Sequence, residues 1–435
     1  MSPHKSARIR KMTALMVGAA LLLTGCSAGA GDSSSLTGGP VPEEKTTLTV
    51  WSFLPSNYDG GPEAYQAVID GFQKKYPQVT VDLVDMPYPT YFDQIRNATV
   101  AGSGPDVVTM YGGAQAYSYK NGLFPLQNAM SADVKDNLKF VPDNYSQDGN
   151  LYILPTGTYG YALVTNPSLF EQAGVDPEAG LKNWDSLLAT CEAMDAKGIQ
   201  PIASGWKDGY LFETFMYMIS SQMMDEATLK DWVAGKVDID SSLFQQATAR
   251  IVEMNDANCF GGEEALGLSM YDDSFNQFNS GQAAMLATGS FGAAEFAASN
   301  IPGATAMALP QVPESNFTQL IDAGAEAGWS VTRWTKSPEA AAAFVNYLAG
   351  AEAQSLLWDL VAVPPNRSDI KVTGSTEMQK AFLPLVENVE NHSGFPAFPL
   401  PVLAVFERNA GPLMGGSMDM ATFLSQAQSA FVKAK

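Results

Sequence analysis

The 435-residue chain has only two histidines and three cysteines. His4 lies near the N-terminus, so a Ser-His-Asp or Cys-His catalytic arrangement would have to run through His392 alone. No HExxH, CxxC, Walker A or GxGxxG motif occurs. These absences argue against metal-, nucleotide- and histidine-dependent enzymes, and we expect no cofactor and no metal. A glycosidase that needs only two carboxylates is not excluded in this way.

Positive charge is also scarce. The chain has 25 Lys and Arg against 46 Asp and Glu, which gives a net charge of −21. An acidic surface of this kind repels nucleic acid and anionic lipid headgroups. We therefore expect no nucleic-acid partner, and the charge argues mildly against an anionic substrate.

The one marked apolar run is short and lies near the N-terminus. "MSPHKSARIRK" is followed by "MTALMVGAALLL" and "LTGC", which is the order of a secretion signal over residues 1–25. "LTGC" resembles a bacterial lipobox, and this resemblance implies cleavage before Cys26 and lipidation of its thiol (palmitate). The alternative is an ordinary signal peptide with an incidental cysteine. Residues 26–44 would then form a lipidated, Gly/Ser-rich tether that holds the protein outside the cell membrane.

The remaining cysteines are Cys191 and Cys259. In an oxidising exterior they would form a disulfide if their Cα atoms lie close enough, and otherwise they are two buried thiols. The sequence leaves both alternatives open.

Strand and helix patterns alternate along the body. Residues 46–53 read as a strand, Pro62 opens a helix, residues 79–83 alternate as a second strand, and a further helix leads to "GPDVVTMYGG". This βαβαβ order predicts an α/β fold with a mostly parallel sheet. A second α/β run starts near residue 152, with helices expected at 184–197, 209–224 and 337–360, the last with Ser337 as N-cap.

Seven segments in register resemble the family 1 extracellular solute-binding proteins, the substrate receptors of carbohydrate ABC importers. They are "LTVWSF", "GFQKKYPQVTV", "SGPDVVTMYGG", "LPTGTYGYALVTNPSLFEQAGVDP", "NWDSLL", "FNSGQAAMLATGSF" and "SPEAAAAFVNYLAGAEAQ". The resemblance covers almost the whole mature chain. It implies a two-lobed periplasmic-binding-protein-like fold, each lobe a mostly parallel sheet flanked by helices, with the ligand cleft between the lobes.

The resemblance also implies how the chain is divided. The N-terminal lobe would comprise residues 45–155 plus 312–362, and the C-terminal lobe residues 156–311 plus 363–435. The chain would cross between the lobes near Leu154–Pro155, near Leu309–Val312 and around Val361–Pro364. Such receptors close about a hinge when they bind solute.

The stretch "PIASGWKDGYLFETF" supplies candidate ligand contacts in the second lobe. Trp206 stands in a loop before a helix, where we expect an exposed indole that stacks on ligand, with Asp208 as the N-cap beside it. Tyr210 and Glu213 are spaced i, i+3 and share a helix face, whereas Phe212 and Phe215 are expected in the core. For Glu213 the alternative is a solvated helix charge.

Further candidates come from loops at strand ends, from glycines that let backbone amides approach a hydroxyl, and from segments that match the family. Aromatic rings cover the C–H faces of a sugar, while carboxylates and amides bind its hydroxyls. The set is Asn57, Phe53, Tyr88, Tyr111, Gly112, Tyr159, Ser290, Phe291, Glu326, Trp329 and Arg367. Trp329 is expected to be exposed in the cleft, and Arg367 is read either as a ligand contact or as a salt bridge.

These features predict a monomeric, membrane-tethered receptor that captures a neutral sugar, most simply a short oligosaccharide, and delivers it to permease subunits without any chemistry. One alternative is a secreted carboxylate glycosidase that uses Glu213 and Glu326. The other is a receptor of the same fold for a polyol or glycerol phosphodiester. A phosphate would need nearby cations, and the candidate segments offer only Lys207 and Arg367.

Overall fold

A computed structural model describes residues 36–58, 60–112, 114–139, 149–290, 301–315, 323–325, 327–374, 376–387 and 398–434. The predicted cleavage site, Cys26 and most of the tether lie outside these ranges, as do Phe291 and Glu326. No helix of the described ranges is long and apolar enough to cross a membrane.

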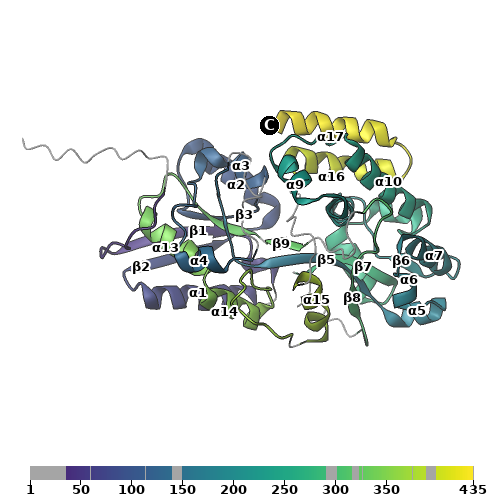
Figure 1. The fold of residues 1–435 in the computed structure, drawn as a ribbon, viewed down its shortest axis with the longest axis horizontal. Helices are drawn as coiled ribbons and strands as arrows, with labels where there is room; N and C mark the ends of the chain where they lie inside the picture. The colour runs from purple at the N-terminus through teal and green to yellow at the C-terminus, as the bar shows by residue number, and fades with distance from the viewer. Residues whose placement is uncertain are drawn as a thin grey trace, which may run out of the picture. The chain divides into compact units, whose positions relative to one another are not determined.

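The first sheet has the strand order β2-β1-β3-β10-β4. β1, β2 and β3 run parallel, and β10 is antiparallel to β3 and β4. The elements around this sheet are β1 (Thr46–Ser52), β2 (Val79–Asp85), β3 (Val107–Met110), β4 (Leu154–Pro155), β10 (Gly328–Val331), α1 (Gly61–Lys75), α2 (Tyr88–Ala101), α3 (Ala114–Ser118), α4 (Ala132–Asn137), α13 (Pro338–Leu348) and α14 (Ala351–Val361) (Figure 1).

The second sheet has the order β6-β7-β5-β8, with β9 paired to the beginning of β5. Its elements are β5 (Thr158–Thr165), β6 (Gln200–Ile202), β7 (Ala283–Gly289), β8 (Thr305–Met307), β9 (Ala323–Ala325), α5 (Pro167–Ala173), α6 (Pro177–Gly180), α7 (Trp184–Asp195), α8 (Tyr210–Ser220), α9 (Glu226–Val233), α10 (Ser242–Asp256), α11 (Phe275–Asn279), α15 (Glu377–Glu387), α16 (Leu400–Met414) and α17 (Met420–Ala434). The α/β class is confirmed.

The expectation of mostly parallel pairing holds less well for the second sheet. β6 and β7 are parallel, but β5 is antiparallel to β7 and to β8. β5 enters this sheet directly from β4 rather than through a helical crossover, and a helical crossover is what makes successive strands run parallel.

One antiparallel ladder joins the two sheets. Leu154 of β4 pairs with Trp329 of β10, and Thr158 of β5 pairs with Ala325 of β9 in the same register. Gly328 is required here, because an added Cβ would lie 2.7 Å from the carbonyl oxygen of Leu154. Next to the ladder, the Thr158 amide donates to the carbonyl of Pro364 over 2.7 Å, so a third segment of the chain, around Pro364, lies beside the ladder.

The chain returns to the first sheet later than expected. Leu309 and Val312 are buried in the core of the second sheet, and the Val312 amide donates to the Gln222 side chain over 2.8 Å. The passage back is made by β9 and β10 instead of by Leu309–Val312. The buried environment of Val312 is the physical reason, because it holds this segment with the second core.

The helix expected over residues 337–360 is two helices, α13 and α14. Gly350 separates them in an extended conformation, with φ −80° and ψ 164°, so the backbone cannot continue the first helix. Pro338 begins α13 as predicted, but the Ser337 side chain makes no capping bond to the helix and instead hydrogen-bonds Thr46 over 2.7 Å.

Cys191 and Cys259 form a disulfide, with their Cα atoms 4.8 Å apart. The bond joins α7 to the segment that follows α10, and both residues are fully buried in the second core. This settles the alternative that the sequence left open.

We expect the free energy of unfolding of the Cys191→Ala/Cys259→Ala variant to be about 2–4 kcal/mol lower than that of the parent. The disulfide joins residues 68 positions apart and so restricts the conformations of the unfolded chain. Urea denaturation of the variant and of the oxidised parent measures the difference. Equal midpoints for the two proteins would contradict a disulfide in the native chain.

Candidate functional site

An aromatic group forms where β1 and β3 end. Phe53 follows β1, Tyr88 begins α2 and Tyr111 follows β3; the ring centroid of Phe53 lies 5.0 Å from that of Tyr88 and 5.5 Å from that of Tyr111. Carboxyl ends of parallel strands share one edge of a sheet, and this edge is where open α/β sheets bind ligands. Phe53 is fully buried, so Tyr88 and Tyr111 are the half-buried members that provide surface.

Two further aromatic side chains hold this group in place. Tyr91 donates its hydroxyl to the carbonyls of Trp51 and Thr109, each over 2.9 Å, and thereby fastens α2 to the ends of β1 and β3. Phe92 lies 5.9 Å from Phe53. Sequence reasoning missed both residues, although their positions one turn after Tyr88 were a usable signal.

A second group of polar and aromatic side chains lies along one face of α8. Tyr210 begins the helix, Glu213 follows one turn later and Tyr217 one turn after that. The Tyr217 hydroxyl donates to Glu213 Oε1 over 2.6 Å, and its ring stacks on Tyr161 of β5 with centroids 6.2 Å apart. The shared face predicted for Tyr210 and Glu213 is present, whereas Tyr161 and Tyr217 were missed.

Asp208 and Gly209 fix the start of this helix. The N-cap of α8 is Gly209, so the expectation of Asp208 at that position is wrong. Asp208 instead precedes the cap and accepts from the amides of Tyr210 (3.2 Å) and Met270 (2.9 Å), which ties the start of α8 to the π-helical segment Met270–Ser274. Gly209 has φ 73°, and an added Cβ would lie 2.5 Å from Glu407 Cα in α16. The close approach of α16 therefore requires glycine here.

The carboxyl of Glu213 lies in an environment that disfavours its charge. The pKa of Glu213 is raised to about 7, chiefly by burial; the Tyr217 hydroxyl lowers it and the negative charge of Asp208 raises it by smaller amounts. Burial also raises the pKa of Asp208. The alternative reading of Glu213 as an ordinary solvated charge is wrong.

Tyr88 and Tyr210 bring the two groups together. Tyr88 packs against the first core and Tyr210 against the second, and Tyr88 lies close enough to Tyr210 to lower the pKa of its hydroxyl, which burial raises. We define the candidate site as Tyr88, Tyr111, Tyr161, Tyr210 and Glu213; Tyr217 is 1% exposed and supports Glu213 from within the core. Its rings and hydroxyls, with one carboxyl, can cover an apolar face and bind polar groups at its rim.

The expected exposure of two tryptophans is wrong. Trp206 is 1% exposed and packs edge-on against Phe260 with centroids 4.8 Å apart. Trp329 is also 1% exposed, because β10 lies between β3 and β4 and points this indole at Tyr65 and Phe344. The two cores account for both indoles, and we do not place them in the candidate site.

Of the two alternatives for Arg367, a ligand contact or a salt bridge, the structure shows the salt bridge. Its fully buried guanidinium pairs with Asp133 (3.0 Å) and Asp369 (2.8 Å) and donates to the Ala349 carbonyl. These partners raise the pKa of Arg367 against the opposing effect of burial. The group therefore serves the fold.

The other predicted residues are dispersed. Ser290 is buried and accepts from the Gly160 amide over 3.2 Å, Tyr159 lies in β5 against Tyr161, Gly112 is buried beside Tyr111, and Asn57 is exposed. Phe212 and Phe215 are fully buried, which confirms their core assignment.

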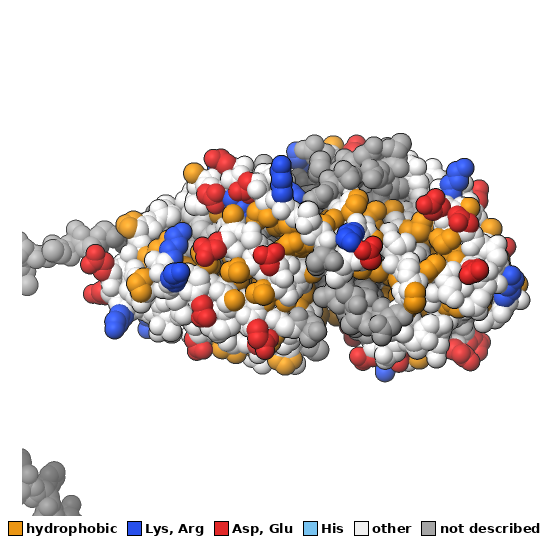
Figure 2. All heavy atoms as spheres, turned by 90° about the horizontal axis from the view of Figure 1, so that it is seen from below, with side chains coloured by type: hydrophobic (Ala, Val, Ile, Leu, Met, Phe, Trp, Pro, Cys, Tyr) orange, Lys and Arg blue, Asp and Glu red, His pale blue; other side chains and the backbone are white. Residues whose placement is uncertain are grey.

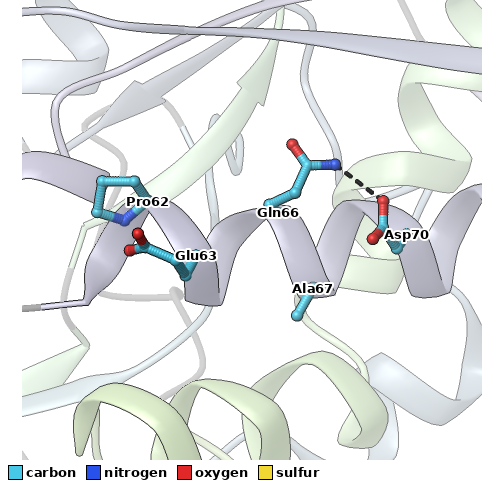
Figure 3. A pocket seen from close by; sticks show the side chains of 5 residues that line it. All are labelled: Pro62, Glu63, Gln66, Ala67 and Asp70. Carbon is cyan, nitrogen blue, oxygen red and sulfur yellow. Dashed lines mark hydrogen bonds between the residues drawn. The ribbon is translucent and has the colours of Figure 1, made fainter.

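Outside the candidate site, a shallow depression lies along α1. Pro62, Glu63, Gln66, Ala67 and Asp70 line it, and Gln66 donates to Asp70 over 2.8 Å (Figure 3). All five belong to one helix, so no second element faces a solute there. Over the described residues, no group of His, Cys, Asp and Glu is arranged to hold a metal ion.

Residues 57–355 match the model of a family described as "Bacterial extracellular solute-binding protein". An uncharacterized ABC transporter extracellular-binding protein of Pyrococcus horikoshii is 21% identical over 385 residues, which cover 86% of this chain and 83% of that protein. The arabinooligosaccharide-binding protein of Halalkalibacterium halodurans is 24% identical over 164 residues, which cover 36% of this chain and 35% of that protein.

Solved structures show the same architecture. A chitin oligosaccharide binding protein matches with a TM-score of 0.75 at 20% identity, covering 90% of this chain and 99% of its own. The GacH receptor of Streptomyces glaucescens matches with a TM-score of 0.68 at 20% identity, covering 90% and 98%. The predicted two-lobed fold of the periplasmic binding proteins is thereby confirmed.

The raised pKa of Glu213 predicts a pH dependence of stability. Between pH 4.5 and about 7 the folded chain holds a proton that the unfolded chain has lost, so the free energy of unfolding falls as pH rises through this window. Glu213→Gln should remove this slope and raise stability above pH 7 by up to about 3 kcal/mol relative to the parent.

Urea denaturation at a series of pH values measures this effect. Glu171→Gln, at an exposed position of α5, is the matched control and should leave the slope as in the parent. If the free energy of unfolding depends on pH in the same way in the parent and in Glu213→Gln, the carboxyl of Glu213 is not shielded from water.

The core position of Trp329 predicts a large effect of truncation. Trp329→Ala should lower the free energy of unfolding by about 3–5 kcal/mol, because it empties a packed volume between the sheet and α13. Val100→Ala, at a side chain 86% exposed, should change it by less than about 0.5 kcal/mol. Urea denaturation measures both variants. If Trp329→Ala has the same free energy of unfolding as Val100→Ala, the indole of Trp329 is not buried in the core.

Proposed function

The chain belongs to the bacterial extracellular solute-binding protein family, and we propose that it captures a neutral sugar, most simply a short oligosaccharide, and passes it to the permease of an ABC importer. The observation that carries this proposal is the proximity of Tyr88 and Tyr111, at the strand ends of the first sheet, to Tyr210 and Glu213 of α8. Tyrosine rings suit the C–H faces of a sugar, and hydroxyl and carboxyl groups suit its rim.

The charges near the site support a neutral solute. Glu213 and Asp208 would repel a phosphate, and the buried guanidinium of Arg367 is engaged by two carboxylates elsewhere. Lys207 is exposed beside Asp208. A phosphodiester receptor would need a cationic cluster in its place, so the polyol or phosphodiester alternative is the weaker one.

The relatives support the sugar class without identifying the sugar. One is named for arabinooligosaccharides and one solved structure for chitin oligosaccharide. We propose further that the protein does no chemistry, because Asp208, the carboxyl near Glu213 in the described residues, is engaged by the amides of Tyr210 and Met270. Secretion and a lipid anchor at Cys26 stay predictions from the sequence, as does the monomeric state.

Calorimetry on the chain from Ser27 onward tests the proposal. We expect one-to-one binding of one member of a panel of chitotriose, arabinotriose and maltotriose, with the sugar recovered intact. Tyr111→Ala should weaken this binding about tenfold through loss of ring contact, whereas Tyr76→Phe, remote from the site, should not change it. If the sugar is cleaved, the protein is a glycosidase and the proposal is wrong. If none of the neutral sugars binds, the proposed substrate class is wrong.

A further inference from the structure

The third connection between the two lobes begins at a segment that is fixed to the first lobe. Val363 is buried in the first core, and Arg367 forms an isolated antiparallel bridge with the residue that ends α4. The chain reaches the second sheet only in α15, where Met378 packs with buried residues of β5 and β7. The connection is therefore made by residues 370–376, later along the chain than expected from Val361–Pro364.

The guanidinium of Arg367 holds this segment. Its Nε and Nη2 each donate to Asp369 over 2.8 Å, its Nη1 and Nη2 each donate to Asp133 over 3.0 Å, and Nη1 also donates to the Ala349 carbonyl over 3.2 Å. These bonds use every N–H of a fully buried group. Bidentate pairs between a guanidinium and a carboxylate have a fixed planar geometry, so they set where the chain leaves Asp369.

Backbone hydrogen bonds hold the same segment on both sides of Arg367. The Ser368 amide donates to the carbonyl of Asn137 over 2.8 Å, and the Asn366 amide donates to the buried side chain of Gln354 over 2.7 Å. Asn137 ends α4 and Gln354 belongs to α14. The segment is thus fastened to two helices of the first lobe, and we call residues 363–369 the clamped segment.

The clamped segment is connected to the candidate site through Pro364. The Pro364 carbonyl accepts from the Thr158 amide over 2.7 Å and from the Thr158 hydroxyl over 3.3 Å. Thr158 begins β5, pairs with Ala325 in the ladder between the lobes, and precedes Tyr161 of the candidate site on the same strand. The position of the clamped segment therefore affects both the ladder and the strand that carries Tyr161.

We propose that Arg367 is a positioning residue for solute capture, which fixes the start of the third connection to the first lobe and thereby holds the hinge and β5 in place. The proposal rests on the proposed function, because it gives Arg367 a part in binding without any contact with solute. If the clamped segment is loosened, the sugar-free chain samples more lobe orientations, and closing on solute then costs more entropy. Binding weakens although every group that touches the sugar is retained.

Amide hydrogen exchange of the sugar-free chain tests whether Arg367 holds this segment. Arg367→Lys keeps the positive charge but cannot form two bidentate pairs, and Asp133→Asn is a milder change that removes one ion pair. Each variant should speed exchange of the Thr158 and Ser368 amides by about tenfold through local opening. Val68→Ala, a truncation in the first core that takes part in none of these bonds, is the control and should leave both amides as in the parent.

Two results of this measurement would overturn the proposal. One is unchanged exchange of both amides in Arg367→Lys and in Asp133→Asn. The other is an equal acceleration in Val68→Ala, because the effect would then follow from lower stability of the whole first lobe.

Affinity and release kinetics, measured with the trisaccharide that the parent binds, test the role in capture. Arg367→Lys and Asp133→Asn should each bind about three- to tenfold more weakly, mainly through faster release. The double variant should lose little more than the weaker-binding single variant, because both changes act on one set of bonds. Val68→Ala should bind like the parent.

The binding results decide between a positioning role and a purely structural one. Parent-like affinity and release in Arg367→Lys and Asp133→Asn, or an equal loss in Val68→Ala, would show that the ion pairs serve stability alone and would overturn the proposal. If the parent binds no sugar of the panel, the proposed function is wrong, while hydrogen exchange still decides whether Arg367 fixes the third connection.

Discussion

The antiparallel ladder between residues 154–160 and 323–329 is the constraint on which the rest of the structure depends. It continues in one register from β4 and β10 into β5 and β9, so it fixes where each sheet begins relative to the other. It also accounts for the direction of β5 in the second sheet and for Gly328, whose backbone lies against Leu154. A ladder of backbone hydrogen bonds can twist without losing its register, which suits a hinge.

The candidate site depends on how loops are fixed at the ends of elements. In the first lobe, Tyr91 joins α2 to the ends of β1 and β3, and this places Tyr88 and Tyr111 together. In the second lobe, Asp208 and Gly209 place the first turn of α8, which carries Tyr210 and Glu213. The remaining surface carries interspersed acidic and basic side chains over the face seen in Figure 2. The site is thus distinguished by its rings and its shielded carboxyl rather than by a charged patch.

Periodicity and family resemblance were sufficient to predict the α/β class, the two lobes and the helix face shared by Tyr210 and Glu213. The tryptophans were predicted wrongly for a physical reason: a loop or strand residue that looks isolated in sequence can face a core built by distant segments, as Trp206 faces Phe260. The disulfide and the partners of Arg367 likewise depend on long-range proximity, which one sequence does not reveal. Tyr161 and Tyr217 were missed because they come together only when β5 packs against α8.

The central claim is that tyrosines of both lobes bind one solute. A crystal structure of the chain with its bound oligosaccharide tests this most directly. We predict that the sugar contacts Tyr111 from the first lobe and Tyr210 or Glu213 from the second, with Trp206 and Trp329 remaining in their cores. A sugar that stacks on either tryptophan, or that binds one lobe alone, would contradict the account.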